Sequence, residues 1–326
     1  MELLLHVGMR KTASTYIQTL CYHNQSLLET NNIYFPVPDY VESKLKQGKL
    51  NPGNAETLYE NLRKKEDSNF LHNLKNYVDE AKEKGLSKLL LSNEKLFIPL
   101  SEVKVSDFIN KIKSTGIDSL RIILIVRNPI NHALSLYKHQ NMTGRFESFT
   151  EWFQKKYNSF KYVEKLAEVF GSNILSIKKM ETQPIEITLF KDWLGVSGFT
   201  RNIQTANVSL TISEIHTLQN LRKNGLEILA GFTYQDLLDL DSKDKFDDRQ
   251  LEFNYKSYLY HKLKSEINLK LLKEYFTKDE NFNKVNNLFI DEKKVMLSQS
   301  QLKVIFNSFK FYNSPKGQLK KTFRKN

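Results

Sequence analysis

Apolar runs alternate with stretches of helical periodicity along the first half of the chain. Residues 3–7, 89–91 and 122–126 are short and almost wholly apolar, which is typical of strands buried on both faces. A further run at residues 174–177 predicts a fourth strand. Because helical segments separate these runs, the pattern predicts an α/β fold with a parallel sheet and right-handed crossovers.

The segments between the strands carry apolar residues at helical spacing. We expect helices over residues 15–28, 70–84, 103–116 and 185–194. Beyond Thr211 the chain is mostly helical and polar. This change of composition predicts a core of residues 1–205 and a helical C-terminal extension of residues 206–326, packed on that core.

A further helix is expected directly behind Pro129. Four apolar residues there fall at the spacing of one buried helical stripe: Ile130, Ala133, Leu134 and Tyr137. At about 100° per residue, Ser135 points some 140° away from Ile130. The helix can therefore bury its apolar face and still turn the Ser135 hydroxyl toward a ligand.

The loop after the first strand has the composition of an anion-binding site. Residues 10–15, Arg-Lys-Thr-Ala-Ser-Thr, connect that strand to the next helix. The free N–H groups at the start of a helix converge on one spot, where the helix dipole also favours negative charge. Lys11 adds a full positive charge, and the hydroxyls of Thr12, Ser14 and Thr15 add neutral donors. We predict that this loop binds a phosphate-like group.

A second cation, Arg127, stands at the end of the strand expected over residues 122–126. Anionic ligands of open parallel sheets bind at the carboxyl ends of the strands, so Arg127 is expected at the same edge as the Lys11 loop. A guanidinium is a planar, two-pronged donor that suits a phosphate, and the Ser135 hydroxyl can serve a remaining oxygen. The two segments predict the two halves of one clamp for a doubly charged ligand.

The composition limits the partners and the compartment. Lys and Arg number 49 against 37 Asp and Glu, a formal net charge of +12, which favours polyanionic ligands. We find no zinc-finger spacing, paired RNP aromatics or GXXG loop, so we expect no nucleic-acid partner. The leading leucines are too few for a signal peptide or a membrane span. The single cysteine, Cys21, is expected to be a buried structural thiol in a cytoplasmic protein, with peripheral membrane contact left open.

Together the two segments resemble the sulfotransferases that use 3'-phosphoadenosine 5'-phosphosulfate, in particular the bacterial and carbohydrate-type members. The run R-N-P-I-N-H-A-L-S-L-Y at residues 127–137 is similar to the family's 3'-phosphate-binding segment, and residues 10–15 resemble its 5'-phosphosulfate loop. The resemblance covers roughly residues 1–200. It implies a P-loop-NTPase-like α/β core that transfers a sulfuryl group to a hydroxyl, or an amine, of a carbohydrate or glycolipid acceptor.

The resemblance also implies roles for individual residues. Lys11 would contact the bridging and non-bridging oxygens of the phosphosulfate, while Arg127 and Ser135 hold the 3'-phosphate. Glu94, directly after the strand at residues 89–91, stands where many glycan-type and bacterial members have a catalytic base. The remaining loop residues would bind the donor beside Lys11: Arg10, Thr12, Ala13, Ser14 and Thr15. No metal is required in this family, and acceptor choice lies in variable segments such as residues 36–70 and the C-terminal third.

The chain departs from the family pattern in the loop and at the C-terminus. Arg10 stands where cytosolic members usually have Pro, and Ala13 where they usually have Gly. The C-terminal segment that closes over the nucleotide in the steroid and phenol enzymes is not found. Two other functions stay open, a P-loop-type nucleotide kinase and a nucleotide-binding protein without transfer activity. The kinase pattern fails at one point, because Arg10 rather than glycine precedes Lys11.

The role of Glu94 has an alternative as well. Its carboxylate could pair with a neighbouring lysine and be purely structural, although a polar residue at a strand's carboxyl end is well placed for chemistry. His132 and His139 are then the reserve candidates for the base, and both lie on the helix behind Arg127.

Overall fold

The computed structural model describes residues 1–142, 147–200, 210–277, 280–284, 290 and 295–317. Its contacts divide the chain into two units. The first comprises Met1–Asn128 and Asn158–Ala206, and the second comprises Pro129–Tyr157 and Asn207–Asn326. Each unit is therefore built from two separate stretches of sequence.

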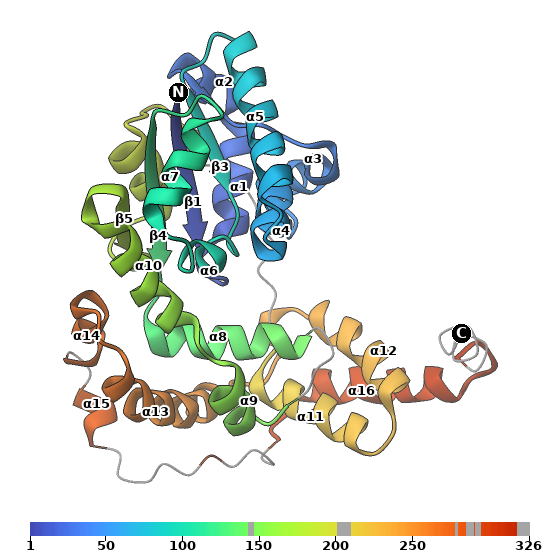
Figure 1. The fold of residues 1–326 in the computed structure, drawn as a ribbon. Coiled ribbons are helices and arrows are strands. Elements are labelled where there is room, and N and C mark those ends of the chain that lie inside the picture. Colours follow the sequence, from blue (N-terminus) through green and yellow to red (C-terminus); the bar gives the residue numbers. More distant parts are fainter. Residues whose placement is uncertain (143–146, 201–209, 278–279, 285–289, 291–294, 318–326) are drawn as a thin grey trace. The chain divides into compact units, whose positions relative to one another are not determined.

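The first unit is built around a five-stranded sheet (Figure 1). Its strands are β1 (Glu2–Gly8), β2 (Ile33–Tyr34), β3 (Lys88–Ser92), β4 (Ser119–Val126) and β5 (Leu175–Lys179). They lie in the order β2-β3-β1-β4-β5, and every neighbouring pair runs parallel. The predicted α/β fold with a P-loop-like parallel sheet is confirmed, and β1 lies at its centre.

Helices of the first unit cover both faces of this sheet (Figure 1). They are α1 (Ser14–His23), α2 (Gln25–Thr30), α3 (Asp39–Lys46), α4 (Glu56–Lys64), α5 (Asp67–Glu83), α6 (Phe97–Leu100), α7 (Val105–Lys113), α10 (Ser159–Ile174) and the π-helix η1 (Ile187–Leu194). On one face, Leu4 and Ile123 of the strands form a buried cluster with Ile17 of α1 and Phe190 of η1.

The other face of the sheet is covered by α5, α7 and α10. A row of aromatic rings joins these helices, with centroids 6.0 Å apart between Phe70 and Phe108 and 6.2 Å apart between Phe108 and Phe170. Because both faces are covered, β1, β3 and β4 are apolar almost throughout rather than alternating. This two-sided burial is what made the strands recognisable in the sequence.

Two local features of the first unit differ from the expectation. The helix expected over residues 15–28 is two helices, which break at Asn24, where the side-chain Nδ2 donates to the carbonyl of Leu20 (2.8 Å). The polar stretch at residues 36–70 contains α3 and α4, and the edge strand β2 precedes it. A strand of two residues is too short to show a period, so the pattern could not reveal it.

The second unit is helical, as predicted for the C-terminal part of the chain. Its elements are α8 (Pro129–Met142), α9 (Phe149–Lys156), α11 (Ile212–Lys223), α12 (Glu227–Leu238), the 3-10 turn η2 (Ser242–Asp244), α13 (Arg249–Glu266), α14 (Lys270–Thr277), α15 (Glu280–Asn283) and α16 (Gln299–Asn313). Aromatic rings fill its core, and the rings of Phe149 and Tyr255 are 4.7 Å apart.

The division into units differs from the composition-based boundary in one segment. Residues 129–157, which form α8 and α9, group with the C-terminal helices rather than with the sheet. Local packing explains this grouping, because Gln219 of α11 donates to the Tyr137 hydroxyl of α8 (3.0 Å). The four predicted stripe residues of α8 are all buried: Ile130, Ala133, Leu134 and Tyr137.

None of the helices in the described residues is both long enough and apolar enough to cross a membrane.

Candidate functional site

The carboxyl ends of three neighbouring strands bring predicted site residues together. The Lys11 loop follows β1, Glu94 follows β3 and Arg127 follows β4, with β1 between the other two. The Arg127 guanidinium donates from Nη1 to the main-chain carbonyl of Lys11 (3.4 Å). On the other side of the loop, Nε of Arg10 lies 4.0 Å from a carboxylate oxygen of Glu94. Three segments far apart in the sequence meet at one edge of the sheet.

The loop between β1 and α1 has a strained backbone. Lys11 (φ 66°) and Ala13 (φ 62°) both adopt the left-handed conformation, which residues other than glycine seldom do. Between them, the buried Thr12 hydroxyl donates to the carbonyl of Met9 (2.5 Å) and closes the turn. Non-glycine residues persist in this conformation only where their surroundings enforce it, and such strain clusters at ligand-binding loops.

The helix that follows the loop begins without a side-chain cap. Ala13 occupies the N-cap position of α1 and makes no side-chain hydrogen bond, and the first turn carries no acidic residue. The first N–H groups and the positive end of the helix dipole are therefore not neutralised by a capping side chain. With the partly exposed Lys11 beside them, they supply the donors and the charge that a phosphate or sulfate group requires.

Burial divides the loop residues into two groups. Four are partly exposed: Arg10, Lys11, Ala13 and Thr15. Thr12 and Ser14 are buried. Because the Thr12 hydroxyl already donates inside the loop, this residue can offer an anion its backbone N–H but not its side-chain proton. The expected hydroxyl contacts to an anion are therefore left to Ser14 and Thr15.

Glu94 is a largely buried carboxylate among cations. Its side chain is 19% exposed. Burial raises its pKa above the ordinary value for glutamate, and the Ser14 hydroxyl and the charges of Arg10 and Lys11 oppose that rise. A carboxylate with a raised pKa accepts a proton more readily than an exposed one does, which is the property required of a general base.

Lys11 in the loop and Arg127 beside it are also partly desolvated. Burial lowers the pKa of Lys11, the Glu94 carboxylate opposes this, and the charge of Arg127 adds to it. Burial likewise lowers the pKa of Arg127, and the Glu181 carboxylate opposes it. Each shift means that the charged form is less stable here than in water. An anion bound against both residues would restore that stability.

Glu181 is a site neighbour that the sequence analysis missed. It follows β5, the strand next to β4, and its carboxylate accepts a hydrogen bond from the backbone N–H of Asn128 (2.8 Å). It thereby holds the chain directly after Arg127. The signal in the sequence was its position just after a predicted strand, the same signal that identified Glu94.

Ser135 lies on α8, in the second unit, and its side chain is partly buried. Its pairing with Arg127 stays a prediction from their spacing in the sequence. The reserve candidate His132 is on the same helix and is fully buried, where its Nδ1 shares a hydrogen bond with the Tyr157 hydroxyl (2.8 Å).

A polar network fixes the end of β3, from which Glu94 projects. The side-chain amide of Asn54 donates to the carbonyl of Leu90 (3.1 Å), and its oxygen accepts from the N–H of Ser92 (2.7 Å). The edge strand β2 pairs with β3 only as far as Leu89. The Asn54 side chain therefore takes over the hydrogen bonding of β3 where its neighbour strand ends.

Two further contacts lock the same segment in place. The side-chain amide of Asn93 donates to the carbonyl of Pro52 (2.9 Å) and to the carboxylate of Glu56 (2.7 Å). Gly53 (φ 89°) lies so close to the end of β3 that a Cβ there would stand 2.1 Å from the carbonyl oxygen of Ser92. Sequence analysis singled out none of these residues, because an Asn-Pro-Gly-Asn run is also what an ordinary surface turn looks like.

Two titratable side chains of the first unit are fully buried. His6 of β1 is fully buried, its Nδ1 hydrogen-bonds with the hydroxyl of Ser92 (2.8 Å), and burial lowers its pKa to about 4. It is therefore neutral at physiological pH. Burial raises the pKa of the Cys21 thiol, in agreement with the structural role expected of it.

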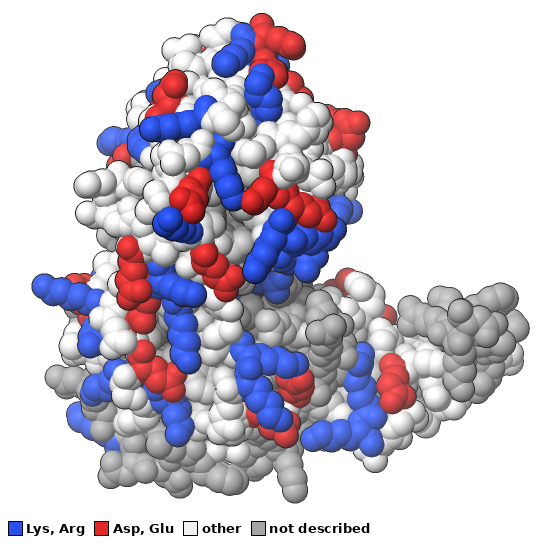
Figure 2. All heavy atoms as spheres, viewed as in Figure 1, with Lys and Arg blue, Asp and Glu red and all other residues white. Residues whose placement is uncertain are grey.

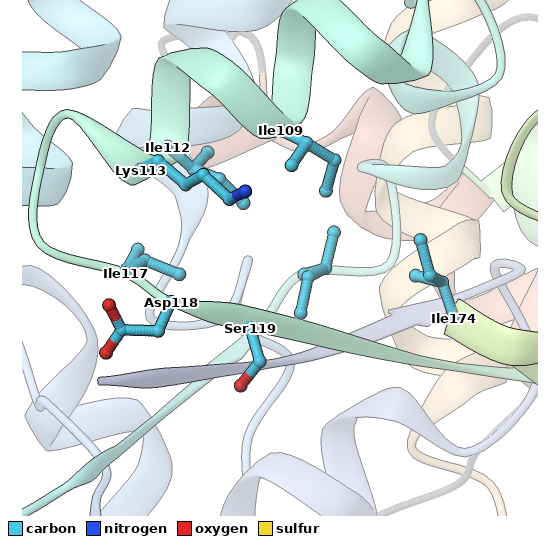
Figure 3. Close-up of a pocket in the computed structure, with 8 residues that line it drawn as sticks. Ile109, Ile112, Lys113, Ile117, Asp118, Ser119 and Ile174 are labelled. Carbon is cyan, nitrogen blue, oxygen red and sulfur yellow. The ribbon is translucent and has the colours of Figure 1, made fainter.

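A cavity in the first unit lies away from these residues. It has a volume of about 100 Å³ and is lined by Ile109, Ile112, Lys113, Ile117, Asp118, Ser119, Leu120 and Ile174. Figure 3 shows mainly isoleucine side chains around it, at the amino end of β4. Since Arg127 follows the carboxyl end of β4, the cavity belongs to the opposite edge of the sheet. Its small, apolar lining fits a packing gap rather than an anion site.

No protein-family model and no curated protein matches the chain. Among solved structures, the chain is similar to the crystal structure of a sulfotransferase from Alicyclobacillus acidocaldarius. The identity is 15% and the TM-score 0.35, over 74% of this chain and 96% of that one. A likeness of this strength carries no inference about chemistry, which rests on the residues themselves.

Within the described residues, no group of three or more His, Cys, Asp or Glu side chains is arranged to hold a metal ion.

Proposed function

We propose that the protein is a sulfotransferase that moves the sulfuryl group of 3'-phosphoadenosine 5'-phosphosulfate to a carbohydrate or glycolipid acceptor. The observation that carries the proposal is the hydrogen bond from Arg127 to the main chain of Lys11 at the ends of adjacent strands. This hydrogen bond supports a clamp in which Lys11 binds one anionic end of a single donor and Arg127 binds the other. The carboxylate of Glu94 adds a proton acceptor on the far side of the loop.

In this proposal the donor is held at two points. The loop N–H groups, the first turn of α1 and Lys11 bind the 5'-phosphosulfate, and the other loop residues lie beside it: Arg10, Thr12, Ala13, Ser14 and Thr15. Arg127 binds the 3'-phosphate through its planar guanidinium, and Ser135 is proposed to serve a remaining oxygen. Glu181 holds the backbone next to Arg127 through Asn128 and so helps to set the direction of the guanidinium.

The transfer itself requires one proton acceptor and one stabilised leaving group. The acceptor oxygen attacks sulfur, a new O–S bond forms, and the S–O bond to the 5'-phosphate breaks. Glu94 takes the proton of the attacking hydroxyl, and the electron pair of the broken bond stays on the phosphate, where Lys11 stabilises it. By analogy with phosphoryl transfer, positioning and charge stabilisation supply most of the rate.

The raised pKa of Glu94 suits this role. Burial brings its pKa closer to neutral pH, so the carboxylate accepts a proton in the transition state more readily than an exposed glutamate does. The charges of Arg10 and Lys11 oppose the rise in pKa and so favour the ionised form, which is the form that accepts the proton. The choice of a carbohydrate or glycolipid acceptor rests on the family resemblance, in which a glutamate stands at this position.

Nucleotide-dependent thermal stabilisation tests the donor assignment. We expect 3'-phosphoadenosine 5'-phosphate, at about one hundred times its Kd, to raise the melting temperature by about 5 °C, because it binds only the folded protein. ATP should give a clearly smaller rise at the same concentration. Lys11→Ala should abolish the shift, whereas Lys113→Ala, which removes a lysine beside the distant cavity, should leave it unchanged.

The competing functions give different results. Stronger stabilisation by ATP than by 3'-phosphoadenosine 5'-phosphate would favour a nucleotide kinase and reject the proposal. A nucleotide-binding protein without transfer activity would also be stabilised by the bisphosphate. It would, however, neither transfer the labelled sulfuryl group to any glycan or glycolipid tested nor slowly hydrolyse the donor.

A further inference from the structure

An apolar face of α16 is left uncovered by its own unit. Leu302, Phe306 and Phe309 are 53%, 56% and 48% exposed, and their spacing places them on one side of the helix. Eight large apolar side chains are exposed in the described part of the chain, and five of them lie between Val295 and Phe309. Such a concentration of exposed apolar side chains marks a site of interaction.

The helix itself is firmly held. The Ser308 hydroxyl donates to Asp236 of α12 (2.8 Å). At its start, Ser298 and Gln301 form a capping box, and the amide of Gln301 donates to Glu214 of α11 (2.8 Å). α16 is therefore packed on one side and exposed on the other, and the exposure of its apolar face is not that of a detached segment.

The same part of the chain contains basic residues and no acidic ones. Residues 293–326 contain nine Lys or Arg and no Asp or Glu. On the helix, Lys303 and Lys310 are both exposed beside the apolar row, and Nζ of Lys310 lies 4.6 Å from the ring centre of Phe306. Over most of the face drawn in Figure 2, in contrast, basic and acidic side chains are interspersed.

We propose that this face, made of Leu302, Phe306, Phe309, Lys303 and Lys310, docks on a lipid membrane surface that carries negative charge. Aromatic and leucine side chains bury themselves at the boundary between headgroups and acyl chains, and neighbouring lysines meet the lipid phosphates. The lysine stems pack along the apolar row while their ammonium groups stay at headgroup level.

Two other occupants fit the charges less well. A second copy of the chain, docked through the same stretch, would bring together two segments that each carry nine Lys or Arg and no Asp or Glu. A nucleic acid would meet the cations, but the centre of the face is a row of one leucine and two phenylalanines, and nucleic-acid sites are dominated by cations and hydrogen-bond donors along the backbone. An anionic bilayer satisfies both the apolar row and the lysines.

The proposal is independent of the donor site. It uses only residues of the second unit and requires no nucleotide. If both proposals hold, docking would keep the protein at the surface where a glycolipid acceptor resides.

Vesicle flotation with the full-length protein tests the docking surface. We expect binding to phosphatidylcholine vesicles that contain phosphatidylserine, and at least about tenfold weaker binding to phosphatidylcholine alone or at high salt. The triple variant Leu302→Ser, Phe306→Ser, Phe309→Ser should lose binding by at least about tenfold. The double variant Lys303→Gln, Lys310→Gln should weaken binding mainly at low salt. Leu50→Ser, which removes an exposed leucine of the first unit, is the matched control and should bind as the wild type does.

Three results would overturn the proposal. The first is equal binding to neutral and anionic vesicles, or none to either. The second is unchanged binding of the triple variant, with the single variant Phe309→Ser as a second test if the triple variant melts at a lower temperature. The third is a wild-type dimer on size-exclusion chromatography that the triple variant converts to monomer without any vesicle binding, which would assign the face to a contact between copies.

Discussion

At the residue scale, Glu94 combines an unfavourable environment with a useful position. Burial raises its pKa, so its ionised form is less favoured in the folded protein than in the unfolded chain. By linkage, the stability that this group contributes is present at low pH and is lost as pH rises through its folded-state pKa. At neutral pH the ionised carboxylate therefore lowers the free energy of unfolding.

Replacing this carboxylate should separate stability from activity. We expect Glu94→Gln to raise the melting temperature while lowering sulfuryl transfer by about 100- to 10,000-fold, because the amide fills the same space but cannot accept the proton. Affinity for 3'-phosphoadenosine 5'-phosphate should be retained. Glu102→Gln, at an exposed position beyond α6, is the control and should change neither property. A variant that keeps full turnover would show that Glu94 is structural and not the base.

His6 should make the free energy of unfolding depend on pH in the acidic range. Its pKa falls from 6.5 to about 4 on folding, because burial disfavours the imidazolium. The unfolded chain therefore binds the proton more readily between these values, so stability is present above pH 6.5 and is lost as pH falls toward 4. Between pH 7 and pH 5 this group alone should remove about 2 kcal/mol from the free energy of unfolding.

Urea denaturation of the wild type and of His6→Gln at the two pH values measures this contribution. The glutamine can keep a hydrogen bond to Ser92 but does not titrate, so the variant should lose about 2 kcal/mol less than the wild type over this range. Equal losses in both proteins would mean that folding does not lower the pKa of His6.

At the scale of elements, prediction from the sequence succeeded where burial is two-sided and periodic. The strands at residues 89–91 and 122–126 could be recognised because both faces of the sheet are covered, and the stripe of α8 because one face of that helix is buried. The break at Asn24 and the two-residue β2 could not, because a side-chain hydrogen bond and a short pairing leave no period in the sequence. The Asn54 network was missed for the same reason.

The Asn54 side chain should contribute to stability, because it makes the hydrogen bonds to β3 that a longer edge strand would otherwise make. We expect Asn54→Ala to lower the free energy of unfolding by about 2–4 kcal/mol, because it leaves the buried carbonyl of Leu90 and the N–H of Ser92 without partners. Chemical denaturation measures the loss. Asn76→Ala, on the exposed side of α5, should stay within about 0.5 kcal/mol of the wild type. A similar small effect at Asn54 would show that water replaces its hydrogen bonds without cost.

At the scale of the whole molecule, the chain order and the division into units do not coincide. α8 and α9 lie between sheet segments in the sequence but group with the C-terminal helices, a fact that composition could not reveal because those helices have ordinary amphipathic patterns. The loop after β1 and Arg127 could be assigned to one sheet edge from the sequence, because parallel strands share the direction of their carboxyl ends. The backbone strain at Lys11 and Ala13 could not be predicted from the sequence, since only the backbone angles show it.

The central claim is that Arg127 recognises the 3'-phosphate of a donor whose other end lies on the Lys11 loop. Isothermal titration with 3'-phosphoadenosine 5'-phosphate and with adenosine 5'-phosphate, for the wild type and Arg127→Ala, tests it most directly. The wild type should prefer the bisphosphate by about 10- to 100-fold, as expected for a charge-assisted contact, and the variant should lose that preference. Arg121→Ala, at a sheet position where the arginine pairs with Glu2, should keep it. If Arg127→Ala weakens both nucleotides by the same factor, the arginine does not read the 3'-phosphate and the account is wrong.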